Sequence, residues 1–276
     1  MFEKFSRSWT LVKASASVLR SDKALMLFPL ISGFATLLVL ATFALPSFAL
    51  GIFDNGLTAI SAFWGFLFYF CQYTVIIFFN CALVGAAMIR LDGGDPTLAD
   101  GFNAARSRFG AILGYAAIAA TVGMLLGALK NRENNILVRL VGSGLGAMWT
   151  LATFLVVPIL VSTDVGPIDA LKSSVNLLKR TWGESAIGQV GIGMVFGLMT
   201  VVLVLVGVAC TFLAAQASVA LAVGVAIVFV AAVLLMGIYQ AALSGVYSAA
   251  LYRFVTQGEA PPAFQGVDMQ HAFAAK

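Results

Sequence analysis

The residues that could perform metal or acid–base chemistry are few, and the densest group of them is acidic. Asp92, Asp95 and Asp100 fall in one short stretch. Their carboxylate oxygens could bind a divalent cation, but carboxylates also cap helices and stabilise helix N-termini. Asp95 precedes Pro96, a pairing that predicts Asp95 as the N-cap of a helix. We therefore predict helix capping here, and no metal or other cofactor.

Histidine and cysteine add little reactive chemistry. His271 is the only histidine and belongs to the C-terminal tail, where we expect it to be exposed to solvent. Cys71, Cys81 and Cys210 lie inside apolar segments without the spacing of metal ligands, so we expect them to pack as small apolar groups.

Catalytic motifs are also missing. The sequence contains no HExxH, no GxxxxGK[ST] and no strand-associated GxGxxG. No charged residue or histidine stands in the middle of an apolar segment, where such groups mark proton relays and ion sites. We therefore predict that the protein is not an enzyme.

Uncharged polar side chains do occur within the apolar segments. They could hydrogen-bond between packed helices, or they could line a path for a neutral solute. The candidates for this polar path are Gln72, Tyr73, Asn80, Gln189, Tyr239 and Gln240. Packing is the favoured interpretation, and the path remains open as the alternative.

Composition predicts a membrane protein. The 276 residues are 61% hydrophobic and 10% charged, whereas roughly a quarter of the residues in a soluble domain are charged. The net charge is +4, but the basic residues flank apolar segments and form no nucleic-acid-binding domain. Membrane topology accounts better for this charge, and no nucleic acid is expected as a partner.

Six apolar segments are long enough to cross the hydrocarbon core, which takes about 20 residues. The first is too long for a signal-peptide core of roughly 7–15 residues. We predict spans near Leu25–Leu50, Leu57–Leu91, Phe109–Leu129, Leu140–Thr163, Ser185–Leu213 and Val219–Phe254. Pro158 should kink the fourth span. Close helix contacts are predicted at Gly110, Gly114, Gly123 and Gly127 and in the runs Gly142–Gly146 and Gly188–Gly193.

Three amphipathic segments precede the first, third and fifth spans: Met1–Lys23, the helix after Pro96, and Pro167–Gly183. In the last, the apolar stripe is Ile168, Leu171, Val175, Leu178 and Trp182. Such helices lie flat on a membrane surface, although the first could equally dock on its own bundle. The residues predicted to bind anionic lipid headgroups are Arg20, Lys23, Arg106, Arg108, Lys172, Lys179 and Arg180.

The predicted fold class is an all-α membrane protein with six transmembrane helices, arranged as three repeats of an amphipathic surface helix plus a transmembrane hairpin. Residues 1–256 form one transmembrane domain, with repeat units of about 1–95, 96–166 and 167–256. Residues 257–276 form a cytoplasmic tail. Lys130, Arg132 and Arg139 are the only cations on one side, and the other thirteen of the 16 lie opposite. The positive-inside rule therefore predicts that both termini are cytoplasmic.

The stretch SWTLVKASASVLRSDKALMLFPLISG, Ser8–Gly33, resembles an uncharacterised family of bacterial polytopic inner-membrane proteins, a domain of unknown function. Its distinctive parts are Trp-x-Leu-Val-Lys and Asp-Lys followed by Phe-Pro, and the tail ending AF-x-x-K, Ala272–Lys276, agrees with it. The resemblance implies a multi-pass protein of a bacterial inner membrane. It assigns no reaction, ligand or site residue.

Two functions from different classes follow. The leading hypothesis is a non-enzymatic inner-membrane protein, a membrane-organising or assembly module that binds anionic lipid at its cytoplasmic face. Its partners would be membrane phospholipids and a second copy or another membrane protein. The alternative is a transporter or channel for a neutral or apolar solute. A sealed, dry interior would count against that alternative.

Overall fold

The computed structural model describes residues 2–54, 56, 58–130, 136–180 and 185–257, and every regular element in these ranges is a helix. Six helical segments within the described ranges are long and apolar enough to cross a membrane: Lys23–Ala49, Ala59–Leu91, Phe109–Leu129, Gly144–Ser162, Gly191–Ala217 and Val219–Gln257. The predictions of an all-helical fold and of six candidate spans are therefore confirmed.

The helices follow one another in the predicted order. Their bounds are α1 (Phe2–Ser21), a 3-10 turn (Lys23–Met26), α2 (Leu27–Ala49), α3 (Ala59–Leu91), α4 (Leu98–Ser107), α5 (Phe109–Lys130), α6 (Ile136–Thr153), α7 (Val156–Ser162), α8 (Pro167–Arg180), α9 (Ser185–Ala217) and α10 (Val219–Gln257). The grouping of these helices into three repeats stays a prediction.

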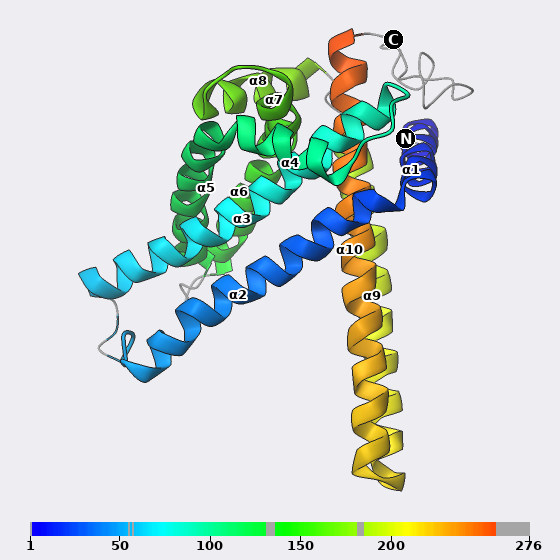
Figure 1. Cartoon of the computed structure of the whole chain (residues 1–276). Helices are drawn as coiled ribbons and strands as arrows, with labels where there is room; N and C mark the ends of the chain where they lie inside the picture. Colours follow the sequence, from blue (N-terminus) through cyan, green and yellow to red (C-terminus); the bar gives the residue numbers. More distant parts are fainter. Residues whose placement is uncertain (1, 55, 57, 131–135, 181–184, 258–276) are drawn as a thin grey trace.

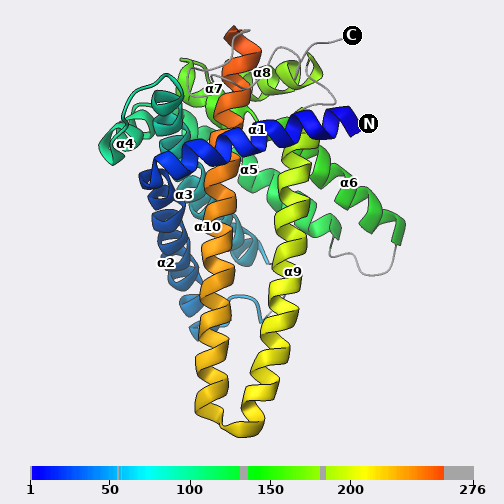
Figure 2. The ribbon, with the colours of Figure 1, turned by 90° about the vertical axis from the view of Figure 1, so that its right-hand side faces the viewer.

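The three short amphipathic helices gather at one end of the molecule, which we call the collar end. Figure 1 and Figure 2 both place α1, α4 and α8 there, beside the C-terminal end of α10. The α2–α3 and α9–α10 hairpins point away from the collar end, and the α9–α10 hairpin projects beyond the other helices in both views. The amphipathic helices and the tips of the two hairpins thus lie at opposite ends of the molecule.

The core lies where the long helices meet the collar. Cys81–Met88 and Leu91 of α3 are buried, and so are Ala242, Leu243 and Val246–Tyr252 of α10. From α1, Val12, Val18 and Leu19 are buried as well. The apolar face of α1 therefore packs on α9 and α10 over its described half, which is the docked arrangement that the sequence left open. By contrast, most of the large apolar residues of α2 and of the α9–α10 hairpin are exposed, as expected of surfaces in lipid.

The N-cap of α4 corrects the sequence prediction. The cap is Thr97, whose hydroxyl accepts from the Asp100 backbone N–H at 3.2 Å while the Asp100 carboxylate accepts from the Thr97 N–H at 2.9 Å. This reciprocal capping box needs an acidic or amide group three residues after the cap, and Asp100 supplies it for Thr97. Asp95 instead forms an ion pair with Arg90.

The fourth span is broken into α6 and α7, as the prediction of a kink at Pro158 requires. Proline cannot donate to the carbonyl four residues earlier and clashes with it, and that residue, Phe154, lies in the break. Ser174 of α8 satisfies the groups that the break frees. Its hydroxyl donates to the Ala152 carbonyl at 2.7 Å and accepts from the Leu155 N–H at 3.2 Å.

The buried face of α8 differs from the predicted stripe. Ala170, Ser174 and Leu178 are buried, whereas Ile168 is 59% exposed. The short side chains of Ala170 and Ser174 let α8 approach the α6–α7 break, and this contact sets the rotation of the helix. Leu171 packs partly against the core.

Some of the predicted close contacts at glycines are present in the structure and others are not. A Cβ at Gly114 would lie 2.8 Å from Pro167, and one at Gly123 would lie 2.9 Å from the Tyr73 hydroxyl, so these two positions are closely packed. The prediction is wrong for contacts within the chain at the other described glycines, which have open space around them: Gly110, Gly127, Gly144, Gly146, Gly191 and Gly193. Contact of these glycines with a second copy stays a prediction. Spacing alone does not say which face of a helix is covered.

Candidate functional site

A cavity of about 430 Å³ lies between α3, α5, the α6–α7 pair and α10, and we call it the lateral groove. Apolar residues line much of the groove, and hydrogen-bonding side chains from α3, α5, α6 and α10 line the rest. These are Tyr73 and Asn80 of α3, Tyr115 of α5, Trp149, Thr150 and Thr153 of α6, and Ser244 and Ser248 of α10. Such a concentration of polar side chains inside apolar spans makes the groove the candidate site.

The floor of the groove is buried and its rim is open. Val84, Tyr115 and Ser248 are almost fully buried. On the rim, Thr150 of α6 and Ala241 of α10 are exposed. Because both rim residues belong to apolar candidate spans, the groove opens sideways toward the surrounding lipid.

Two glycines set the width of the groove. The Tyr73 hydroxyl rests on Gly123 of α5, where a Cβ would come within 2.9 Å of it. On the opposite wall, Gly245 of α10 lies directly against Leu83 of α3, and no Cβ would fit between them. The absence of a side chain at these two positions lets α5 and α10 close on α3.

The hydroxyl groups of the groove present acceptors. The Thr150 hydroxyl donates to the Gly146 carbonyl at 3.0 Å, that of Thr153 to Trp149 at 2.8 Å, and that of Ser248 to Gly245 at 2.9 Å. Each proton is thereby held within its own helix, and the oxygen lone pairs remain for a ligand. The groove therefore suits a ligand that brings its own hydroxyl or amide donors.

Asn80 is the most versatile polar group of the lining. Its amide makes no hydrogen bond with the part of the chain that the structure describes, although it can both donate and accept. Tyr115 of α5 and Thr153 of α6 line the same cavity. Asn80 is thus the side chain that a ligand would engage.

No charged side chain lines the groove among the residues that the structure describes. An ion or a charged headgroup in this apolar setting would lack a counter-charge, and its burial would cost several kcal/mol. The lining therefore selects for an uncharged ligand.

The predicted polar path is only partly assembled. Tyr73 and Asn80 line the groove, whereas Gln72, Tyr239 and Gln240 do not. Tyr239 packs on the ring of Phe196, and the Gln72 carbonyl oxygen is buried without a partner among the described residues. The side chain of Gln189 lies outside the described residues. Sequence reasoning missed Thr150, Thr153, Ser244 and Ser248, whose spacing of three or four residues on two helices is the signal that could have found them.

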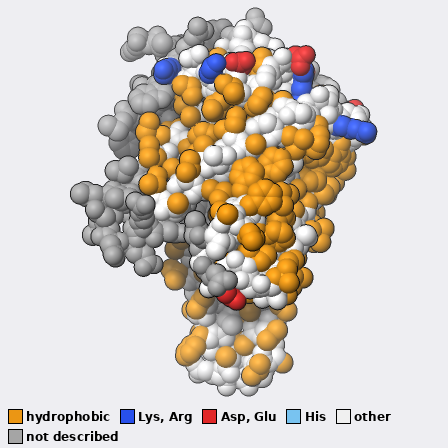
Figure 3. Space-filling model, turned by 90° about the vertical axis from the view of Figure 1, so that its left-hand side faces the viewer, with side chains coloured by type: hydrophobic (Ala, Val, Ile, Leu, Met, Phe, Trp, Pro, Cys, Tyr) orange, Lys and Arg blue, Asp and Glu red, His pale blue; other side chains and the backbone are white. Residues whose placement is uncertain are grey.

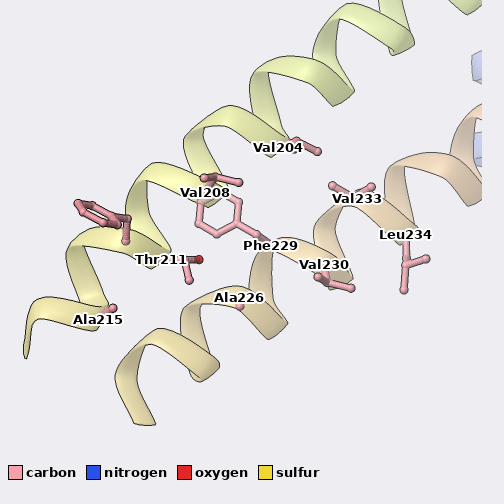
Figure 4. Close-up of a pocket in the computed structure, with 11 residues that line it drawn as sticks. Val204, Val208, Thr211, Ala215, Ala226, Phe229, Val230, Val233 and Leu234 are labelled. Carbon is pink, nitrogen blue, oxygen red and sulfur yellow. The ribbon is translucent and has the colours of Figure 1, made fainter. Parts of the chain in front are cut away.

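A second cavity lies between α9 and α10 toward the tip of their hairpin (Figure 4). Its volume is about 580 Å³, and Thr211 is the only residue with a polar side chain in its described lining. Phe229 packs directly on Gly207, which fixes the distance between the two helices there. This cavity can accept hydrocarbon, but it offers almost nothing to orient a polar group, so it is the weaker candidate.

The predicted headgroup-binding cations lie at the collar end, and Figure 3 shows Lys and Arg side chains gathered there above an apolar face. Arg108 forms an ion pair with Asp164, and Lys172 forms one with Asp169 at 3.3 Å. The side chain of Arg180 lies outside the described residues. Among the predicted headgroup-binding cations, those that are exposed and have no ion pair within the described ranges are Arg20, Lys23, Arg106 and Lys179.

The three aspartates that could have formed a metal site have separate partners. Asp92 forms an ion pair with Arg253 at the end of α10, and Asp95 pairs with Arg90 at 3.2 Å. Asp100 belongs to the capping box of α4, where the Thr97 hydroxyl and N–H lower the pKa of its carboxyl group. These groups hold the loop after α3 in place, and the described residues contain no cluster suited to a metal.

The fold and the groove together define an all-helical membrane protein with several candidate spans and an uncharged lateral site. The model of a family of unknown function, DUF6159, matches residues 59–262. The chain belongs to this family. All residues of the lateral groove fall within the match, whereas the Ser8–Gly33 stretch lies before it. No curated protein matches the chain.

Proposed function

We propose that the protein binds an uncharged amphiphile in the lateral groove and passes its headgroup across part of the bilayer. The observation that carries this proposal is the set of unpaired acceptors around Asn80, in a groove that is open toward lipid and contains no described charge. A fitting ligand has a hydroxyl- or amide-bearing headgroup and a hydrocarbon tail.

The dimensions of the groove support partial crossing. From Tyr73 to Val84 the lining follows α3 for about 16 Å at the helical rise per residue, roughly half of a hydrocarbon core about 30 Å thick. The headgroup would enter the groove between Thr150 and Ala241. Its hydrogen bonds to water would be replaced by hydrogen bonds to the hydroxyl oxygens of α6 and α10. The tail would remain in lipid, and the ligand would undergo no covalent change.

The test uses proteoliposomes that contain a fluorescent short-chain glucosylceramide, whose uncharged sugar carries hydroxyl donors. A membrane-impermeant quencher reports how fast the probe moves between leaflets. The wild-type protein should accelerate this movement, and Asn80→Leu should abolish the acceleration. Asn103→Leu is the matched control, because Asn103 is exposed on α4, outside the groove. Equal rates with and without protein, or equal rates for the two variants, would contradict the proposal.

We propose as a second function that the collar end binds anionic lipid and organises the membrane around the protein, with further copies or other membrane proteins as partners. The supporting observation is that four of the predicted cations, Arg20, Lys23, Arg106 and Lys179, are exposed and have no ion pair among the residues that the structure describes. Replacing Arg20, Lys23 and Arg106 together by Gln should lower the retention of phosphatidylglycerol in native mass spectrometry. Unchanged retention would count against this function.

This second function implies an orientation, with the collar end and both termini in the cytoplasm of a bacterial cell and the spans in its inner membrane. The positive-inside rule and the family resemblance support it. Single cysteines at Asn103 on α4 and at Asp54, near the tip of the α2–α3 hairpin, test it, since both positions are exposed. In intact spheroplasts, an impermeant reagent should label the cysteine at position 54 only. Labelling at position 103 would reverse the orientation.

A further inference from the structure

A third cavity, of about 320 Å³, lies at the collar end between α7, α8 and α10. Uncharged polar side chains from all three helices line it, among them Thr163, Ser173, Asn176, Tyr252 and Thr256. The cavity is separate from the lateral groove, because its α10 residues begin one turn beyond Ser248, where the groove ends. We call it the collar pocket.

One face of α8 lines the collar pocket with two hydrogen-bond donors and carries a third one turn farther along the helix. Ser173, Asn176 and Lys179 follow one another at steps of three residues, so they lie on the same side of the helix. Ser173 and Asn176 line the pocket and make no hydrogen bond within the described ranges, and Lys179 is exposed one turn beyond Asn176. The opposite face of α8 is occupied by the contact of Ser174 with the α6–α7 break.

The charges around the collar pocket favour an anion. The described carboxylates close in sequence to the lining residues of α7 and α8 are Asp164, next to Thr163, and Asp169 at the start of α8. Asp164 is paired with Arg108, and Asp169 is paired with Lys172. No acidic residue is part of the described lining. Lys179, one turn along α8 from the lining residue Asn176, has no ion pair within the described ranges.

We infer that the collar pocket binds a phosphoryl group, with the Ser173 hydroxyl and the Asn176 amide donating hydrogen bonds to its oxygens and the Lys179 ammonium balancing its charge. Hydroxyl, amide and ammonium donors around one site suit such an anion. A phospholipid headgroup or free inorganic phosphate could supply the group. The inference rests on the second proposed function, for which the pocket would be the specific headgroup site.

The test compares two pocket variants, Asn176→Leu and Lys179→Gln, with the same substitutions at exposed positions outside the pocket, Asn103→Leu on α4 and Lys13→Gln on α1, in the full-length protein. Nanodiscs containing phosphatidylglycerol are analysed by native mass spectrometry. Loss of one charged hydrogen bond should lower retention of the tightest-bound phosphatidylglycerol by about tenfold in each pocket variant. Equal retention in the pocket variants and in these two control variants would overturn the inference.

Two further measurements distinguish the two possible sources of the phosphoryl group, and they distinguish failure of the pocket inference from failure of the second proposed function. The first measurement follows the ³¹P line width of inorganic phosphate added to the protein in lipid-free micelles. If the wild-type protein broadens this line and Asn176→Leu does not, the ligand is a soluble anion. Pocket-dependent retention of phosphatidylglycerol without such broadening would identify the headgroup. If the Arg20, Lys23 and Arg106 triple variant releases lipid while the pocket variants retain it, the pocket inference fails and the second function stands. If none of the variants releases lipid, both fail.

Discussion

Replacing Ser174 by alanine should destabilise the protein by about 2–4 kcal/mol. The Ser174 side chain is fully buried and links α8 to both sides of the α6–α7 break. Alanine would remove the acceptor of the Leu155 N–H and the donor to the Ala152 carbonyl. An unsatisfied buried polar group costs about 1–3 kcal/mol, and Leu155 is fully buried, so its N–H cannot turn to water.

The free energy of unfolding can be measured by SDS titration of the full-length protein in mixed micelles, followed by tryptophan fluorescence. Ser107→Ala is the matched control, because the Ser107 hydroxyl is exposed and bonds only to Ala104 of its own helix. That change should stay within about 0.5 kcal/mol of wild type. If Ser174→Ala unfolds at the same free energy as Ser107→Ala, the Ser174 hydroxyl does not hold the break, and the reasoning about α7 is wrong.

Three other predictions concern packing and capping. Gly123→Ala should displace the Tyr73 hydroxyl, which lies 2.9 Å from the added Cβ, and slow glucosylceramide movement, whereas Gly127→Ala, in open space, should not. Gly101→Ala should lower the free energy of unfolding by about 1–3 kcal/mol, because the added Cβ would lie 2.7 Å from the Ala82 carbonyl oxygen and against the Phe28 ring. Gly110→Ala is the control for this change, because a Cβ at Gly110 would lie in open space. Thr97→Ala should cost about 1 kcal/mol at pH 7. The pKa of Asp100 is lowered in the folded protein, so the ionised carboxylate stabilises the fold fully at pH values above its ordinary pKa of 3.8. This stabilisation is lost as the pH falls through the lowered pKa. A Thr97→Ala penalty of equal size at pH 7 and pH 2.5 would contradict this.

The spans could be predicted from the sequence because length and apolar content decide them locally. The third span, Phe109–Leu129, was predicted with the bounds that the structure gives it. The start of α4 was misplaced because a proline after Asp95 resembles a helix start, whereas the capping box at Thr97 depends on Asp100 three residues later. Local patterns therefore locate helices better than they locate the first residue of each helix.

The groove could be predicted only in part, because it depends on which helix faces meet. Tyr73 and Asn80 were recognisable as polar residues within an apolar segment. Thr153 and Ser248 were overlooked because a hydroxyl that bonds to its own helix is common in apolar helices, and only their spacing from Thr150 and Ser244 marks them. The contact of Ser174 with Ala152 and Leu155 joins residues about twenty positions apart, and no spacing rule predicts it. Nor could spacing show that Gly123 would pack on Tyr73 while Gly127 stays open.

The central claim is that an uncharged amphiphile occupies the lateral groove, and headgroup photo-crosslinking tests it most directly. Nanodiscs would carry a glucosylceramide with a diazirine on its sugar, and the labelled residues of the full-length protein would be mapped by mass spectrometry. We predict labels on groove residues of α3, α6 and α10, such as Asn80, Thr150 and Ser244, and their loss in Asn80→Leu. Labels spread evenly over the lipid-exposed faces of α2 and α9, and unchanged in Asn80→Leu, would contradict the claim.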